Sequence, residues 1–327
     1  MSSETDTYKT AVNHYLSPKR QDPVKVQWEN AFSSNLTQQV VTKLVQDLGL
    51  KEISVVDFGC GIGEGLTLLH QILGDLAITK DHIFYTGVDI SPQMIATAEE
   101  KWADEPNAKF CLQDIREAVP NHPTQLYYSC GVPYSHLTPE EMLGVLINVF
   151  KVIKANQTES LILIDVLGRY SIEWITKWQE SRWAYCMSFL AESAESQTPM
   201  MMTCYYAPEL QEMFEQAAAL SGCEIASLEF HDRSLMVGRH STTNEYNPHI
   251  PPYRYVVNDL YEPGRKTDLT KLLLNCPLPA APGPVEAFLR NFPRNGMGWL
   301  PLRPNGGGNW MDLNGLISIA IGPTNTA

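Results

Sequence analysis

Residues 53–65 read Ile53-Ser54-Val55-Val56-Asp57-Phe58-Gly59-Cys60-Gly61-Ile62-Gly63-Glu64-Gly65, an apolar run followed by a segment in which every second residue is glycine. The next residues, 66–73, have the composition of a helix. A buried strand, a glycine-rich turn and a helix N-terminus bring backbone N–H groups close to a ligand, because glycine adopts positive φ and has no side chain in the way. The stretch therefore predicts a site for a nucleoside-like cofactor.

The spacing of the glycines excludes a dinucleotide-binding turn. That turn follows the pattern G-x-G-x-x-G, which needs a third glycine three residues after the second. After Gly59 and Gly61 this position holds Glu64, and starting one glycine later it holds Leu66. The pattern present is G-x-G-x-G.

With Asp57 two residues ahead of the first glycine, the turn resembles the first motif of the class I S-adenosylmethionine (SAM)-dependent methyltransferases. The resemblance implies that Asp57 organises the turn and the amino-acid end of the cofactor. It also implies that Gly59, Cys60 and Gly61 let the backbone approach the cofactor.

Two later strand ends extend the resemblance, which covers roughly residues 40–240. Residues 84–91 predict a strand ending at Asp89, followed by a helix with Ser91 as its cap and Pro92 in its first turn. Residues 109–115 predict a third strand ending near Asp114. The resemblance implies that Asp89 takes both ribose hydroxyls, that Asp114 accepts from the adenine amino group, and that Ile90 or Ile115 packs on the ring. The expected cofactor-binding residues outside the glycine turn are Asp89, Ile90, Met94, Asp114, Ile115 and Ser129.

The fourth strand, predicted over residues 125–130, departs from the family. The acidic or asparagine residue often present at its end is replaced by Ser129-Cys130-Gly131. This departure leaves the identity of the catalytic group open, but it does not affect the expected cofactor. A Rossmann-like site for another nucleoside, or a site that binds nothing, is the alternative.

The composition limits the classes of partner. The chain has 327 residues, 44% of them hydrophobic, and 24 Lys and Arg against 37 Asp and Glu, for a net charge of −13. A negative chain without a basic cluster repels a phosphate backbone, so nucleic acid is not an expected partner. The seven cysteines lack C-x-x-C spacing, and neither a signal peptide nor a membrane span is apparent, so we expect reduced thiols and a cytoplasmic location. We expect a small-molecule or peptide substrate, no membrane, and a homodimer as the one candidate assembly.

Strands that alternate with helical patterns predict an α/β fold with a doubly wound, mostly parallel seven-stranded sheet. The expected domains are an N-terminal lid over residues 1–39, a SAM-binding domain over 40–240 with an inserted helical cap at 168–207, and a C-terminal extension over 241–327. Two endings of the sheet remain open. Residues 223–230 and 234–238 can form a closing antiparallel pair, or residues 316–321 can supply the final strand and make 239–312 an insertion.

Methyl transfer to an alcohol or phenol calls for a general base, whereas a carboxylate is already ionised and needs only orientation. His136 lies just past the fourth strand and is the candidate base; a histidine bonded to backbone at a helix start is the alternative. Arg169 follows the fifth strand and can bind a substrate carboxylate or form a surface ion pair. The remaining candidate substrate-binding residues are aromatic, and Trp174 and Trp178 can instead pack onto the sheet. They are Tyr15, Trp28, Tyr134, Trp174 and Trp178.

These features favour O-methylation, on hydroxyl or carboxylate, of a small-molecule or peptide acceptor in specialised metabolism. N-methylation and a non-catalytic protein that keeps the fold for binding are the alternatives.

Overall fold

The computed structural model describes residues 21–73, 78–185, 200–234, 238, 253–272, 279–291 and 315–323. Among these residues, no helix is both long and apolar enough to cross a bilayer.

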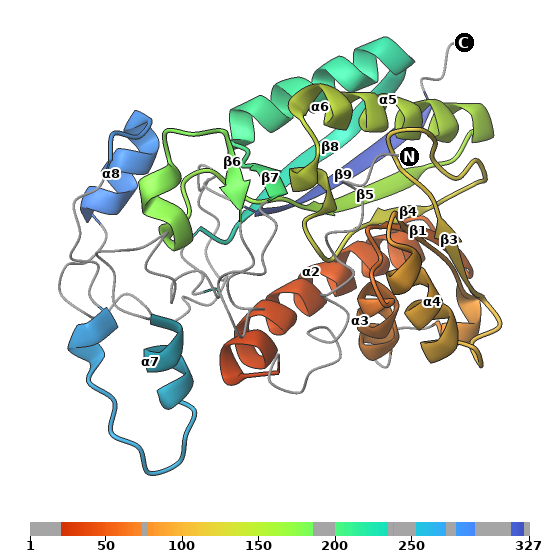
Figure 1. Ribbon diagram of the computed structural model, residues 1–327. Helices are drawn as coiled ribbons and strands as arrows, with labels where there is room; N and C mark the ends of the chain where they lie inside the picture. Colours follow the sequence, from red (N-terminus) through yellow and green to blue (C-terminus); the bar gives the residue numbers. More distant parts are fainter. Residues whose placement is uncertain are drawn as a thin grey trace.

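A seven-stranded sheet with the order β3-β2-β1-β4-β5-β9-β8 forms the centre of the molecule (Figure 1). Strands β1 to β5 are parallel, and β9 is antiparallel to both of its neighbours. The mostly parallel α/β fold is therefore confirmed. The strands are β1 (Ile53–Phe58), β2 (Ile83–Asp89), β3 (Ala108–Leu112), β4 (Leu126–Tyr128), β5 (Ser160–Asp165), β8 (Cys223–Asp232) and β9 (Gly315–Pro323).

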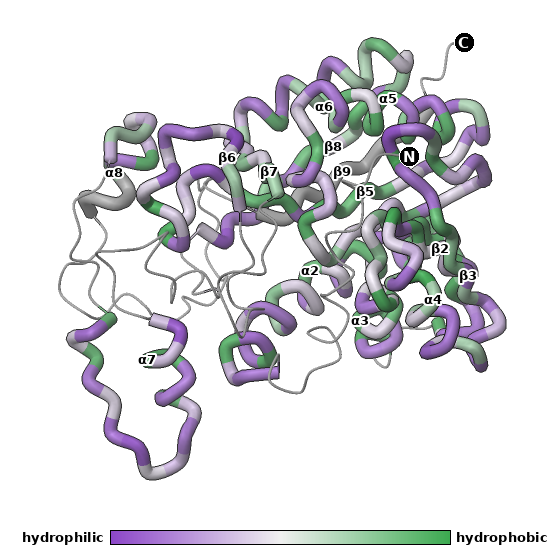
Figure 2. Tube along the Cα trace, viewed as in Figure 1, coloured by the Kyte–Doolittle hydropathy of each residue, from purple (hydrophilic) through white to green (hydrophobic). Residues whose placement is uncertain are grey.

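Helices cover both faces of the sheet, which explains why β1 and β5 are almost continuously buried. The packing of α5 and α6 forms one core with the residues of β1, β4 and β5 that face them, and α2 and α3 form a second core on the opposite face. Figure 2 shows hydrophobic residues along the strands and hydrophilic ones on the outer faces of the helices. The helices are α2 (Ala31–Thr42), α3 (Glu64–Ile72), α4 (Pro92–Lys101), α5 (Pro139–Asn156) and α6 (Ala207–Ser221).

Local capping sets the ends of several helices, and the start predicted at Ser91 is confirmed. Ser91 accepts from the backbone N–H of Met94 at the start of α4. Thr138 and Glu141 form a reciprocal capping box at the start of α5. Gly222 ends α6 with φ of 67°, the left-handed conformation that glycine adopts without strain.

The predicted lid boundary at residue 39 is wrong, because it falls inside α2. This helix buries Leu36, Val40 and Val41 in the core that it shares with α3. Its continuation η3 (Lys43–Asp47) adds Leu44. Residues 31–47 are therefore part of the central fold.

The closing pair predicted over residues 223–230 and 234–238 is also wrong. Strand β8 pairs with β9, and β9 lies between β8 and β5. The alternative, in which residues 316–321 supply the final strand along the chain, is confirmed. The segment between β8 and β9 is therefore an insertion. A domain boundary at residue 240 would separate β9 from the sheet that it completes.

A third hydrophobic cluster lies beyond the sheet, and we call it the aromatic module. It joins η2 (Val24–Asn30), the described residues of 168–206, and the segment from α7 (Tyr253–Asp259) to Val285. Figure 1 shows α7, α8 (Gly283–Asn291) and the β6–β7 pair on one side of the sheet. The described residues of the predicted helical cap contain the 3₁₀ segment η7 (Ile172–Lys177) and the antiparallel strands β6 (Arg182–Tyr185) and β7 (Met200–Thr203) in place of the expected α-helices.

Candidate functional site

The glycine turn leaves β1 and folds over the end of β2. The backbone N–H groups of Gly59 and Cys60 both donate to the carbonyl of Val88, at 2.8 and 3.1 Å. Gly59, Gly61 and Gly63 have φ of 67°, 53° and 80°, a region that disfavours side chains. A Cβ at Gly59 would lie 2.6 Å from Pro133, whereas a Cβ at Gly61 would meet nothing within 4 Å. The turn is thus packed at Gly59 and open at Gly61.

Asp57 ends β1 beneath this turn and is fully buried. Its Oδ2 accepts a hydrogen bond of 2.5 Å from the Tyr85 hydroxyl. Its Oδ1 is buried and has no hydrogen-bond partner among the described residues. Burial raises the pKa of Asp57, the Tyr85 hydrogen bond opposes this, and the charges of Asp89 and Glu64 add to it, which gives a pKa of about 8.

Asp89 ends β2 next to the same turn. One carboxylate oxygen accepts from the Gly61 N–H at 2.9 Å, and the other accepts from the Ser91 N–H at 2.8 Å. The glycine turn and the cap of α4 each supply one of these backbone donors, so together they orient the carboxylate that the sequence predicts for ribose binding.

The other predicted cofactor residues lie directly after β2, beyond the end of β3, at the end of β4 and in α4. Asp114 lies beyond the end of β3 and binds the Arg116 guanidinium, which lowers the pKa of Asp114. Ile90 and Ile115 are half-buried, as a residue stacked on a base would be, whereas Met94 is buried in α4. Their roles toward adenine stay predictions.

At the end of β4, the predicted cofactor residue Ser129 has a structural contact. Its side chain is buried and accepts from the Asp165 N–H, at 3.2 Å, which ties β4 to β5. Burial raises the pKa of the neighbouring Cys130 thiol well above its usual range. Both groups are therefore neutral near pH 7, and neither is an anionic base.

His136 ends η6 (Pro133–His136), the segment that connects β4 to α5. Burial lowers its pKa, and the charge of Arg182 lowers it further, to about 4. The ring is neutral near pH 7 and can accept a proton, but its conjugate acid is strong, which makes it a weak general base.

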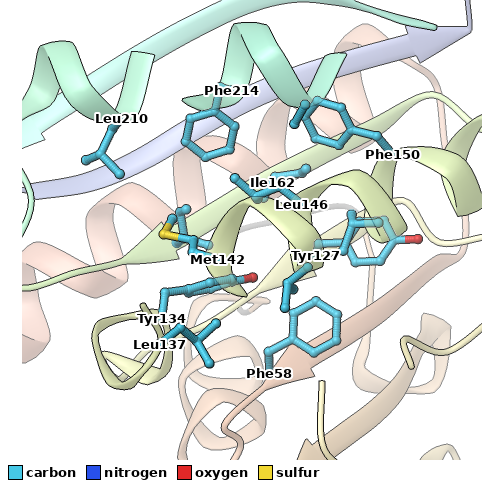
Figure 3. Packing of buried hydrophobic residues seen from close by; sticks show 14 of the residues in the cluster. Phe58, Tyr127, Tyr134, Leu137, Met142, Leu146, Phe150, Ile162, Leu210 and Phe214 are labelled. Atoms are coloured by element: carbon cyan, nitrogen blue, oxygen red, sulfur yellow. The ribbon is translucent and has the colours of Figure 1, made fainter. Parts of the chain in front are cut away.

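Three aromatic residues predicted to bind substrate are buried instead. Tyr134 is 1% exposed and lies edge-on to Phe58; Figure 3 shows it among Leu137, Met142 and Phe58. The indole N–H groups of Trp174 and Trp178 donate to the carbonyls of Gly168 and Ser171, and both rings are buried in the aromatic module. The structure assigns these three side chains to packing. The two tryptophans share no regular helical face, because Trp174 has non-helical φ and ψ.

The other substrate candidates have different surroundings. Arg169 donates to the Glu209 carboxylate at 2.8 Å and to the Cys204 carbonyl, which corresponds to the ion-pair alternative. Trp28 belongs to η2, and its indole N–H contacts the Tyr261 hydroxyl. Tyr15 lies outside the described residues.

The structure adds a charged group at the ends of β4 and β5 that the sequence analysis missed. Asp165 ends β5, is buried, and forms an ion pair with Arg233, which follows β8. Lys25 of η2 pairs with Glu29 at 3.2 Å. Burial raises the pKa values of Asp165 and Cys130, and the charge of Lys25 opposes this rise at both groups. The strand-end position of Asp165 was a signal available in the sequence, but nothing in the sequence places η2 beside it.

The site fits SAM in three respects. The open side of Gly61 gives the cofactor access to the backbone, the Oδ1 of Asp57, which has no partner among the described residues, suits a cationic amino group, and the carboxylate of Asp89 at the end of β2 suits ribose hydroxyls. SAM supplies a methyl group on a sulfonium, so the chain's own residues need to bind, orient and exclude water. Within the described residues, no cluster of side chains suits a metal ion.

Comparison with known proteins agrees with this geometry. Residues 55–156 match the family model described as a methyltransferase domain. Malonyl-[acyl-carrier protein] O-methyltransferase 1 of Ilyobacter polytropus is 32% identical over 79 residues, which are 24% of this chain and 27% of that protein. The chain thus matches about a quarter of the length of this curated relative.

Solved structures with a similar fold include a SAM-dependent methyltransferase from Clostridium acetobutylicum, with 12% identity and a TM-score of 0.42, covering 59% of this chain and 82% of that one. Another is magnesium protoporphyrin IX methyltransferase from Synechocystis with bound S-adenosylhomocysteine (SAH), with 15% identity and a TM-score of 0.39, covering 62% and 78%. These similarities concern the fold. The family match assigns a methyltransferase domain to residues 55–156, and the strand order and the glycine turn with its two strand-end carboxylates support the class I SAM-dependent type for that domain.

Proposed function

We propose that the enzyme transfers the SAM methyl group to an oxygen atom of a small-molecule or peptide acceptor, and that this oxygen belongs to a carboxylate. The observation that carries this proposal is the weakness of the bases at the end of β4 and in η6, next to the methyl position that the family resemblance implies. His136 has a pKa of about 4, and Ser129 and Cys130 are neutral. A carboxylate acceptor needs no base, because it has already lost its proton near pH 7.

The local match to an O-methyltransferase is compatible with this chemistry. It covers 79 residues, so it supports the transfer reaction more than the identity of the acceptor. The aromatic module, which is built from segments outside the sheet, supports a role in specialised metabolism, since such additions can shape a pocket for a particular acceptor.

The chemical stability of the transferred methyl group tests the proposal. The enzyme is incubated with methyl-labelled SAM and a panel of carboxylic acids, with the corresponding amides, alcohols and amines as matched controls. We expect label only with the acids, and release of that label as methanol in mild alkali, because methyl esters hydrolyse there and ethers and N-methyl groups do not. Base-stable label, or transfer to the alcohols or amines alone, contradicts the proposal.

The variant His136→Gln tests the role of the histidine in the same assay. With a carboxylate acceptor we expect turnover within about three-fold of the wild type, because no proton leaves the acceptor in the transfer step. We also expect no rise in rate across pH 5.5 to 8 from this histidine, since a pKa of about 4 leaves it neutral throughout that range. A loss of about 100-fold in turnover with unchanged SAH affinity would instead assign His136 as a general base.

A further inference from the structure

Tyr85 and Asp57 form a buried pair on neighbouring strands. Asp57 of β1 is opposite Gly87 of β2, so Tyr85, two residues earlier, points to the same face of the sheet. The two side chains are at most 1% exposed, and the Tyr85 hydroxyl donates to Asp57 Oδ2 at 2.5 Å. A hydrogen bond to a carboxylate in such surroundings is strong and directional.

Helix α3 packs against the same atom, Asp57 Oδ2, from another direction. A Cβ on Gly65, in the first turn of this helix, would lie 2.1 Å from Oδ2 and 2.8 Å from the Tyr128 ring. Glycine at this position lets the helix N-terminus approach the carboxylate. Oδ2 is therefore enclosed by Tyr85 and α3, and Oδ1 is left without a partner among the described residues.

The electrostatic surroundings act on the proton of Asp57. The charged groups nearby are both acidic, Asp89 on β2 and Glu64 on α3, and they raise the pKa that burial has already raised. The other titratable neighbours are neutral near pH 7, because burial raises the pKa values of Cys60 in the turn, Tyr128 on β4, and Cys130 and Tyr134 beyond it. Among the side chains of the described residues, the hydrogen bond from Tyr85 opposes these effects and favours the ionised form of Asp57.

We propose that Tyr85 is a positioning residue for the cofactor: by holding Oδ2 of Asp57 it presents Oδ1 to the cationic amino-acid end of SAM, and the carboxyl proton of Asp57 leaves for solvent as the cofactor binds. The balance is simple, since a neutral carboxyl group and an ammonium ion become a carboxylate–ammonium pair and one proton is released to the buffer. This role concerns the cofactor and does not depend on the acceptor.

SAH binding, measured by titration calorimetry from pH 6.5 to 9, tests the positioning role with Tyr85→Phe. Removal of the hydroxyl raises the pKa of Asp57, so at pH 7 less carboxylate is available. We expect about ten-fold weaker binding at pH 7, equivalent to about one pKa unit, and a difference of less than about three-fold at pH 9, where the carboxylate forms in both proteins.

Tyr127→Phe is the matched control. Tyr127 is also a sheet tyrosine with 1% exposure, but it faces the opposite core and makes no hydrogen bond to Asp57. We expect its SAH affinity to follow the wild type at every pH, and titration of SAH itself affects all three proteins equally. An unchanged affinity in Tyr85→Phe, or a loss of equal size at every pH, overturns the positioning role, since the latter is the result of a packing defect.

Calorimetry at pH 7 in two buffers with different ionisation enthalpies counts the proton directly. We expect the wild type to release about one proton on binding SAH, and Asp57→Asn to release none. Release of no proton by the wild type, or equal release by both proteins, overturns the proton step. Thermal unfolding of each unliganded variant verifies that it is folded in these measurements.

Discussion

The cofactor half of the sheet, which is the part that carries the glycine turn, and the aromatic module are held together by different kinds of contact. In the cofactor half, Asp57 and Asp89 come from adjacent strands, and backbone groups of one short turn orient Asp89. The aromatic module assembles three segments that are far apart in the sequence, and each of the described hydrogen bonds and ion pairs between them involves at least one side chain. Local backbone geometry thus builds the cofactor site, whereas long-range side-chain contacts build the module.

One ion cluster joins the first and last segments of the module. Arg254 of α7 has 5% side-chain exposure and donates to Asp22 at 2.7 and 2.5 Å and to Glu29 at 2.8 Å. Although burial by itself raises the pKa of Glu29, the charges of Lys25 and Arg254 together lower it to about 2. The cluster is therefore fully ionised across the physiological pH range.

The largest effect on the cofactor half is expected from a substitution that adds a methyl group on the open side of Gly61. Gly61→Ala introduces strain at φ of 53° and occupies the space that the cofactor needs, so we expect SAH affinity to fall about 1,000-fold, or roughly 4 kcal/mol. Gly49→Ala is the control, since Gly49 has φ of 64°, equally open surroundings, and a position outside the turn. Calorimetry with SAH on both variants separates strain from obstruction. Equal affinities would show that Gly61 does not face the cofactor.

The corresponding test of the module is Arg254→Met, which removes the cation that Asp22 binds and leaves Glu29 with Lys25 alone among the described cations. We expect a loss of about 3 kcal/mol in unfolding free energy, as for other broken buried ion pairs, with SAH affinity unchanged. Tryptophan fluorescence during urea unfolding reports this loss well, because Trp28, Trp174, Trp178 and Trp183 all belong to the module.

Arg265→Met provides the matched surface pair. Arg265 is 51% exposed and binds Asp259 and Glu262, so its removal should leave the unfolding free energy almost unchanged. If both arginine variants lose the same stability, the cluster around Arg254 does not hold the module. If Arg254→Met loses SAH affinity as strongly as Gly61→Ala, the two regions are not independent.

Asp57→Asn is expected to raise the unfolding free energy at high pH, whereas Arg254→Met lowers it. The pKa of Asp57 in the folded protein, about 8, lies above its ordinary value of 3.8, so the stability gained from the bound proton is complete below pH 3.8 and is lost as the pH rises through 8. Asparagine does not titrate. The stability of the variant relative to the unliganded wild type should therefore rise steadily between pH 5 and pH 8 and level off near pH 9. Thermal unfolding of both proteins across this pH range measures this, and a constant difference between them would contradict the raised pKa.

The contrast between local and long-range contacts explains which features the sequence could predict. The turn at residues 57–63 and the caps at Ser91 and Thr138 depend on neighbours a few residues away, and they appear as expected. The pairing of β8 with β9 crosses more than 80 residues, and a plausible local hairpin competed with it. Trp174 and Trp178 have the spacing of a helical face, but the 3₁₀ kink and the hydrogen bonds to Gly168 and Ser171 decide their orientation. Lys25 carries no local signal, because its place beside Asp165 depends on the docking of η2 against α7.

The position of β9 has a consequence for synthesis on the ribosome. Strands β1 to β5 can pair as the nascent chain emerges, but β8 has no partner in the sheet until residues 315–323 have left the exit tunnel. Until then β5 presents an unpaired, apolar edge, which is the kind of surface that chaperones shield and that associates with other chains. The insertion between β8 and β9 lengthens this interval, so the rate of translation through it sets how long the incomplete sheet is exposed.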